Sequence, residues 1–224
     1  ELARAFNAMA ENLAQSEQRR SEFVANVSHE LKTPMTTIAG FMDGMLDGTI
    51  PPEEHRKYMQ MVSDEVRRLS RLVREMLEIS RLRAQEKESI HWQVFDLCEP
   101  LGEGLISFER RINDKHIQVE VDLPEEGCRV LAAPDAITQV IRNLLDNAVK
   151  FTPEGGRLGL RLAVEGDKAV TTIYNTGATI PPDELQLIFD RFHKTDKSRS
   201  EDRDGVGLGL YIVKTIMDAH GEDI

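Results

Sequence analysis

Apolar and polar residues alternate with the period of an α-helix over the first 46 residues of the chain. Apolar side chains recur at steps of three and four from residue 2 to residue 13 and again from residue 24 to residue 45. No clear stop signal interrupts the pattern before Asp47. The sequence therefore predicts one long helix that ends at about Leu46. The apolar stripe of its second half consists of Val24, Val27, Leu31, Met35, Ile38, Met42 and Met45.

A second helix is predicted after a turn at residues 47–52, because Pro51-Pro52-Glu53-Glu54 is typical of a helix start. Its apolar residues recur at alternating steps of four and three, the spacing of a coiled-coil seam. Two such helices leave apolar surface exposed, so we expect two chains to form a homodimeric four-helix bundle. The seam consists of Val62, Val66, Leu69, Val73 and Met76. The charged residues between them are interpreted as a solvated face: Arg67, Arg68, Arg71 and Arg74 with Glu65, Glu75 and Glu78.

After a polar linker at residues 83–91, short alternating segments replace the continuous helical pattern. Helices beside a mixed sheet predict a two-layer α/β sandwich. The predicted strands lie near residues 94–97, 117–121, 130–131, 158–162 and 170–174, and the predicted helices at 97–113, 134–151, 182–190 and 208–219.

His29 lies on the face of the first helix that is opposite to the apolar stripe. It is two residues from both Val27 and Leu31, which is a rotation of about 200°, and Thr33 shares its face one turn later. Pro34 has no N–H for the carbonyl of residue 30 and crowds it, at a cost of ~3 kcal/mol. A strained, kinked turn beside an outward-facing imidazole predicts a site of chemical reaction and of conformational movement. The alternative is an exposed histidine beside an incidental kink.

Two further patterns indicate phosphate chemistry. Asn143, Asn147 and Lys150 form a polar stripe on the predicted helix 134–151, and their amide oxygens and ammonium suit a hydrated Mg²⁺ that carries a polyphosphate. An ordinary exposed face explains the stripe equally well. The glycine-rich stretch 204–209 opens a helix, where the backbone can approach phosphate closely and the helix N-terminus favours negative charge.

Composition and charge narrow the function classes. Of the 224 residues, 40% are hydrophobic and 30% charged, and the net charge of −11 argues against nucleic acid or an anionic membrane surface as the direct partner. Cys98 and Cys128 lack metal-ligand spacing, which favours a reducing compartment. No apolar run is long enough to span a bilayer. The chain begins at Glu1 inside a helical pattern and stops at Ile224 straight after a helix, so we expect part of a longer protein whose closing strands are missing.

Four motifs resemble those of the sensor histidine kinases of two-component systems, in that family's order. SHELKTP at 28–34 resembles the phosphoacceptor box, NLLDNAVKF at 143–151 the N box of the GHKL ATPases, FDRF at 189–192 the F box, and DGVGLGLYIV at 204–213 the G2 box. ELARAFNAMAENL, at the start of the chain, resembles the closing helix of a HAMP relay.

The resemblance implies a multidomain α and α+β protein. A HAMP-like helix (1–20) would precede an antiparallel helical hairpin (21–88) that forms a dimeric four-helix bundle for dimerisation and phosphotransfer. A two-layer α/β sandwich of the GHKL (Bergerat) fold (89–224) would bind ATP.

The resemblance also implies roles for individual residues. His29 would accept the phosphoryl group, Glu30 would take the proton from the ring, and Thr33 would orient a water for phosphatase action. Asn147 would ligate Mg²⁺ with Asn143 in support, Lys150 would meet phosphate, and Phe151 would line the nucleotide pocket. The G2 box would contribute Gly205, Gly207, Leu208 and Gly209. In the loop between the F and G2 boxes, an ATP lid, Lys194 is the preferred phosphate contact, with Lys197, Arg199 and Arg203 within reach.

The G1 box departs from the family pattern of Asp-x-Gly-x-Gly. It contains Asn175, Gly177 and Ile180, with Thr179 in place of the second glycine. The Asn175 oxygen can accept from the adenine amino group, but its amide nitrogen adds a donor, and a flipped amide would suit guanine. The sequence therefore predicts retained ATP binding with looser discrimination between bases.

The implied function is ATP- and Mg²⁺-dependent autophosphorylation of His29, with phosphoryl transfer to an aspartate of a response regulator. We expect no nucleic-acid partner, an upstream transmembrane sensor, and therefore the cytoplasmic portion of a membrane protein. Two alternatives are a catalytically decayed dimeric scaffold, favoured by Asn175 and Thr179, and a GHKL ATPase that does not phosphorylate histidine. The remaining histidines are expected to serve surface or packing roles: His55, His91, His116, His193 and His220.

Overall fold

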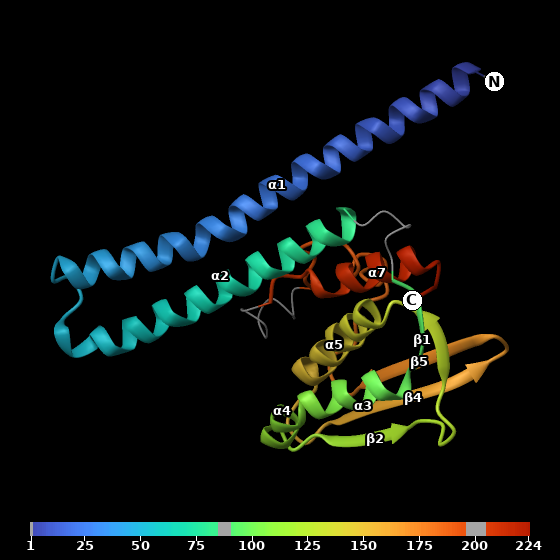
Figure 1. Cartoon of the computed structure of the whole chain (residues 1–224). Helices are drawn as coiled ribbons and strands as arrows, with labels where there is room; N and C mark the ends of the chain where they lie inside the picture. Colours follow the sequence, from blue (N-terminus) through green and yellow to red (C-terminus); the bar gives the residue numbers. More distant parts are fainter. Residues whose placement is uncertain (1, 85–90, 196–204) are drawn as a thin grey trace. The chain divides into compact units, whose positions relative to one another are not determined.

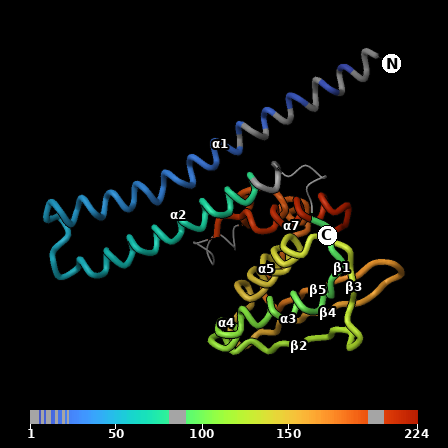
Figure 2. The backbone as a smooth tube through the Cα atoms, in the orientation of Figure 1, coloured from blue at the N-terminus to red at the C-terminus, as the bar shows by residue number. Residues whose placement is uncertain are grey.

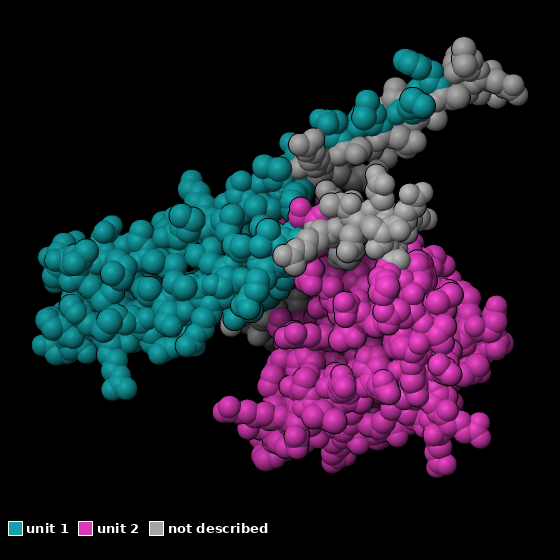
Figure 3. Space-filling view, in the orientation of Figure 1, with its two compact units in different colours: residues 1–77, 204–206 teal, residues 78–203, 207–224 magenta. Residues whose placement is uncertain are grey.

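A computed structural model of the chain describes residues 2–84, 91–195 and 205–224. The chain divides into two units, which Figure 3 colours separately. The helical unit comprises residues 1–77 and 204–206, and the sheet unit comprises residues 78–203 and 207–224.

Two long helices make up the helical unit. Helix α1 runs from Leu2 to Leu46, and α2 from His55 to Ala84, after the 3-10 turn η1 at Pro52–Glu54. Figure 1 shows α1 reversing into α2 as an antiparallel hairpin. Gly48 has φ +82°, which glycine adopts without strain, and the Ile50 N–H donates to the Gly44 carbonyl at 2.7 Å. The prediction of one long helix to Leu46 is confirmed, and the helix continues through Pro34.

The apolar stripe of α1 divides between two surfaces. Val27, Leu31, Ile38 and Met45 are half-buried, whereas Val24, Met35 and Met42 are exposed. The seam of α2 divides similarly, because Val62, Leu69 and Met76 are half-buried while Val66 and Val73 are more than 40% exposed. Between the two helices, the rings of Phe41 and Tyr58 meet edge to face at 5.0 Å. One chain thus covers only part of its own apolar surface.

The sheet unit contains a ribbon and a mixed sheet. Strands β1 (Gln93–Asp96) and β3 (Arg129–Ala132) pair antiparallel. The second sheet has the order β2-β4-β5, in which β2 (Gln118–Asp122) is parallel to β4 (Arg157–Glu165) and β5 (Lys168–Asn175) is antiparallel to it. Figure 2 shows the helices of this unit on one side of the sheet. They are α3 (Cys98–Ser107), α4 (Glu109–Asp114), α5 (Pro134–Phe151) and α7 (Gly209–His220).

The core of the sheet unit lies between β4 and the helices. Leu158, Leu160 and Leu162 alternate along β4 and are all at most 4% exposed, and they belong to one cluster with Leu101 of α3 and Leu145 of α5. The predicted two-layer sandwich is confirmed. Its core fixes the helix that carries the polar stripe against the sheet.

Two local predictions are wrong. Residues 97–113 form two helices, because the chain bends at Phe108, which is buried. Residues 182–190 form successive turns, such as Glu184 N–H to Pro181 carbonyl at 2.9 Å, rather than a helix. The strand predicted near residues 170–174 is present as β5, and its residues packed against the core are Ala169 and Ile173, because the register pairs Ile173 with Leu160.

Candidate functional site

His29 is exposed on α1, and within the described residues no hydrogen bond reaches its ring. The Thr33 hydroxyl donates to the His29 backbone carbonyl at 3.2 Å, and Thr33 is exposed too. Both side chains therefore lie on the outward face that the helical spacing predicts. The imidazole is therefore accessible to an incoming molecule.

Hydroxyl groups surround the point where Pro34 interrupts the backbone hydrogen bonds of α1. Ser28, Thr36 and Thr37 each donate to the carbonyl four residues earlier, at 2.8, 2.9 and 3.2 Å. Such bonds compete with the helix's own bonds and favour bending. Pro34 is buried and lies inside the continuous helix α1, as the prediction of one helix to Leu46 requires. The local weakness of the backbone remains next to His29.

Glu30 faces α2 rather than His29. Its Oε2 accepts from Nη2 of Arg68 at 3.3 Å, and Nη1 of Arg68 lies 3.8 Å from Oε2 of Glu65. The sequence-based interpretation of Arg68 as part of a solvated face is wrong, because its side chain is only 21% exposed. Helical periodicity could not identify this pair, since the partners are 38 residues apart.

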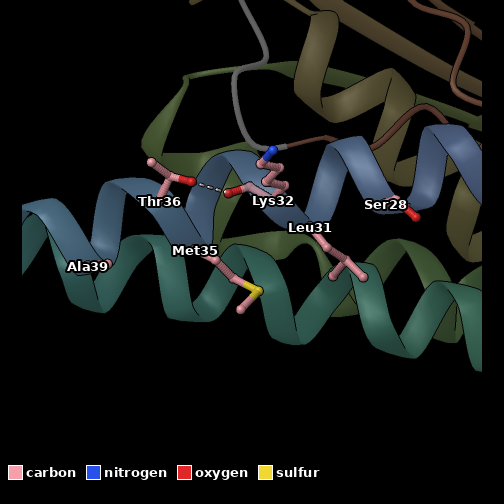
Figure 4. A pocket seen from close by; sticks show the side chains of 6 residues that line it. All are labelled: Ser28, Leu31, Lys32, Met35, Thr36 and Ala39. Atoms are coloured by element: carbon pink, nitrogen blue, oxygen red, sulfur yellow. Dashed lines mark hydrogen bonds between the residues drawn. The ribbon is translucent and has the colours of Figure 1, made fainter.

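A shallow groove lies along α1 beside His29. It is lined by Ser28, Leu31, Lys32, Met35, Thr36 and Ala39 (Figure 4), and Leu31 and Met35 point to the same side of the helix. The lining combines the apolar side chains with the Lys32 ammonium and the hydroxyls of Ser28 and Thr36.

In the sheet unit, α5 and α7 bring the N box and the G2 box together. The Asn143 Nδ2 donates to the carbonyl of Gly209, the first residue of α7, at 3.3 Å. This bond leaves the Asn143 oxygen available. Asn147, one turn later on the same stripe, is half-buried, and the described residues offer its side chain no hydrogen bond. Two amide oxygens are therefore left for a ligand.

Lys115 fixes the end of α5. Its Nζ donates to the carbonyls of Val149, Lys150 and Thr152 at 3.0, 2.8 and 2.8 Å, which satisfies carbonyls that a helix C-terminus leaves unpaired. Beyond it, the Lys150 ammonium lies 5.4 Å from the centre of the Phe151 ring. Sequence reasoning missed Lys115, because nothing in its neighbourhood signals a contact 34 residues away.

The G1 box meets the end of α5 at Gly177. A Cβ at this position would lie 2.6 Å from the Phe151 carbonyl oxygen, so only glycine fits. At the end of β5, the Asn175 Nδ2 donates to the Thr176 carbonyl at 3.1 Å, and its oxygen remains an acceptor. Ile180 is 37% exposed.

The F box and the G2 box meet through the backbone. Gly207 has φ +77°, and a Cβ there would lie 2.8 Å from the His193 carbonyl oxygen, while the Phe192 N–H donates to the Gly207 carbonyl at 2.9 Å. Lys194 follows this contact and is half-buried, and Leu208 is completely buried. Gly205, two residues before Gly207, groups with the helical unit. The predicted lid cations Lys197, Arg199 and Arg203 lie outside the described residues.

Four of the other histidines are placed by a hydrogen bond, an ion pair, a ring contact or a turn position. His55 bonds the Ile50 carbonyl at 3.0 Å, and His193 lies 3.3 Å from Glu184. His220 accepts from the Ala133 N–H at 3.2 Å and packs edge to face on Trp92. His116 occupies a left-handed turn position with φ +51°. These settings fit the packing roles that the sequence indicates.

In the described parts of the chain, no cluster of three histidine, cysteine or carboxylate side chains is arranged to hold a metal. None of the described helices is both long enough and apolar enough to cross a membrane.

Comparison with known families assigns both units. Residues 19–85 match the His Kinase A (phospho-acceptor) domain, and residues 132–224 match the Histidine kinase-, DNA gyrase B-, and HSP90-like ATPase. The chain belongs to the bacterial sensor histidine kinases. The first match includes the SHELKTP box of this kinase, and the second includes its N and G2 boxes. Residues 1–18 lie outside both matches.

Relatives of known name agree with this assignment. Sensor protein SrrB of Staphylococcus aureus is 34% identical over 210 residues, which are 93% of this chain and 36% of SrrB. The chain thus spans about a third of the length of the curated relatives it matches. The histidine kinase AdeS of Acinetobacter baumannii is 26% identical with a TM-score of 0.65, over 85% of this chain and 86% of that one. Histidine kinase ThkA, solved in complex with the response regulator protein TrrA, is 30% identical with a TM-score of 0.66, over 82% and 55%.

Proposed function

We propose that this kinase uses ATP to phosphorylate its own His29 and passes the phosphoryl group to an aspartate of a response regulator. The observation that carries the proposal is an exposed imidazole with no hydrogen-bond partner among the described residues, on a phosphoacceptor hairpin. In the sheet unit of the same chain, the N, G1, F and G2 boxes lie in contact with one another.

The neutral imidazole of His29 attacks the γ-phosphorus in line with the leaving ADP. Glu30 takes the proton from the other ring nitrogen, which raises the nucleophilicity of the imidazole. Lys150 and Lys194 neutralise charge on the phosphate oxygens. Gly205, Gly207 and Gly209 let the backbone approach the phosphates, at the N-terminus of α7.

A Mg²⁺ ion fits the oxygens left on α5. Asn147 would ligate it and Asn143 would support it, since Mg²⁺ prefers hard oxygen ligands and keeps waters and phosphates as its other ligands. When bound, the ion would neutralise charge on the β- and γ-phosphates.

Asn175 would select the base. Its Nδ2 donates to the Thr176 carbonyl, so its side-chain oxygen remains to accept a hydrogen bond from the adenine amino group. This orientation supports retained ATP binding and limits the flipped form that would suit guanine. Competition between GTP and ATP measures how loose the discrimination is. GTP binding at least about a thousandfold weaker than ATP binding would contradict the predicted looseness.

Two protein partners complete the proposal. A second copy of the chain would cover the exposed Met42 of α1 with Val66 and Val73 of α2, which forms a four-helix bundle. A response regulator would dock on the groove beside His29. The complex of ThkA with the response regulator protein TrrA supports a partner of this class. Thr33 would orient a water when the kinase acts as a phosphatase.

The signal would arrive from a membrane. Residues 1–20 would serve as the closing helix of a HAMP relay that connects the hairpin to an upstream transmembrane sensor. The described chain would then be the cytoplasmic portion of a membrane protein.

Incubation with γ-labelled ATP and Mg²⁺ tests the proposal. We expect an acid-labile, base-stable label on the protein that is lost in His29→Gln. His91→Gln is the matched control, because His91 is also exposed, and it should label like the original chain. Label retained in His29→Gln would contradict the assignment. Free phosphate without protein label would indicate a GHKL ATPase, and neither product would indicate a decayed scaffold.

A further inference from the structure

Three charged side chains form a cluster between α1 and α2. One of them belongs to Glu30, the residue that follows His29. Arg68 lies 3.3 Å from Glu30 across the hairpin and 3.8 Å from Glu65 on its own helix. Their side chains are only 21%, 32% and 27% exposed, and Glu65 Oε2 is buried without a hydrogen bond among the described residues. Arg68 is thus the positive charge that two carboxylates share.

The position of Glu30 in this cluster conflicts with its role at His29. Successive helical residues diverge by about 100°, so adjacent side chains do not normally face each other. The structure shows the two already separated, with His29 exposed and Glu30 half-buried towards α2. Glu30 must swing from the hairpin interior to the outer face before its carboxylate can meet the imidazole.

We propose that Arg68 is a positioning residue that restrains Glu30 and thereby slows the phosphorylation of His29. The inference rests on the proposed function. In the step it controls, a bond forms between a ring nitrogen of His29 and the γ-phosphorus while the phosphorus–oxygen bond to ADP breaks. The proton on the other ring nitrogen passes to Glu30, which is available only after leaving Arg68.

The contact geometry sets the size of the restraint. Charge-assisted hydrogen bonds are strongest near 2.7–2.9 Å, and both contacts of Arg68 are longer. Ion pairs that water still reaches hold weakly. The cluster therefore restrains Glu30 without locking it, and its removal should change the rate by a small factor.

The test compares single and double variants of the chain. Arg68→Gln should raise the rate of phosphohistidine formation at saturating ATP about threefold, with the half-saturating ATP concentration unchanged. Arg68→Lys keeps the positive charge and should remain near the original rate. In a Glu30→Gln background, Arg68→Gln should have no further effect, because Arg68 acts through Glu30. Arg67→Gln is the matched control, since Arg67 is 67% exposed and pairs only with Asp64 in the described residues.

Phosphoramidate provides a second readout that needs no nucleotide. It transfers its phosphoryl group to imidazole with loss of ammonia, so it reports the reactivity of His29 in the hairpin alone. Arg68→Gln should accelerate this reaction by a similar factor. Acceleration with phosphoramidate in a chain that never labels with ATP would support the restraint and overturn the proposed function. An unchanged or slower phosphoramidate rate, or an acceleration that persists in Glu30→Gln, would overturn the restraint. Thermal melts verify that each variant is folded.

Discussion

The two units hold their site residues in opposite ways. In the helical unit, the contacts around His29 are mostly bonds between residues four apart on α1, and the ring itself is exposed. In the sheet unit, segments more than 30 residues apart lock together through Lys115, and through the bond from Asn143 to Gly209. A phosphoacceptor must be reached by more than one partner, whereas a nucleotide site works best when its groups are fixed in advance. Substitutions should therefore be far more damaging in the sheet unit than around His29.

Among substitutions that leave His29 in place, the largest effect is expected at the oxygen that would meet the metal. Asn147→Ala removes a proposed Mg²⁺ ligand, and we expect the rate of ATP-dependent labelling to fall about a hundredfold or more. Asn113→Ala, at an exposed position of α4, is the control and should leave the rate unchanged. Near-normal labelling by Asn147→Ala would place the metal elsewhere and weaken the contrast between the units.

Gly177→Ala tests the contact between the G1 box and α5. The new Cβ would lie 2.6 Å from the Phe151 carbonyl oxygen, so the strand end or the helix end must shift. We expect nucleotide binding to weaken about tenfold, as measured by titration with a fluorescent ATP analogue. Gly102→Ala is the matched control, because Gly102 lies inside α3 with open space around its Cβ position. Equal affinities for the two variants would show that this junction is not part of the nucleotide site.

Lys115→Met tests how much one long-range contact contributes. The variant loses three charge-assisted hydrogen bonds to the end of α5, and we expect the free energy of unfolding of the sheet unit to fall by about 3 kcal/mol. Urea denaturation followed by the fluorescence of Trp92 measures it. Lys214→Met removes only an exposed pair with Asp218 and should cost less than about 0.5 kcal/mol. A similar loss of unfolding free energy from both variants would contradict the role of Lys115 in holding the end of α5.

The smallest effect concerns pH and appears in both units. Hydrogen bonds from the backbone N–H groups of Cys128 and then Cys98 lower the pKa of Asp96, and the hydroxyl and then the N–H of Thr49 lower the pKa of Asp47. Each carboxylate stabilises the fold fully above its unfolded pKa, near 3.9, and this contribution disappears as the pH falls through the depressed folded pKa.

Urea titrations between about pH 6 and pH 2 measure the free energy of unfolding as the pH falls. Its decrease should be smaller in Asp96→Asn for the sheet unit and in Asp47→Asn for the hairpin than in the original chain. Asp96 joins β1 to the start of β3, whereas Asp47 caps a local turn. We therefore expect the larger change for Asp96. The same pH dependence in Asp96→Asn as in the original chain would rule out its contribution.

Much of the fold followed from local patterns. The hairpin, the strand alternation of Leu158, Leu160 and Leu162, and the helix beginning at Pro134 follow from spacing that a single segment contains. Local signals failed at Phe108, where burial of one ring bends a predicted continuous helix. Local alternation also predicted the strand β5, but pairing with β4 decides which of its residues face the core.

The sequence by itself determined which chemical groups are present and which helix face presents them. Spacing along one helix places His29 outward and aligns Asn143 with Asn147, because those relations depend only on helical geometry. The tertiary structure alone decided that Arg68 bonds Glu30, that Lys115 holds the end of α5, and that Gly177 leaves no room for a side chain. Each of these contacts joins residues far apart in the sequence. Such pairs form only when the burial of apolar surface brings separate segments together, and no local pattern records that event.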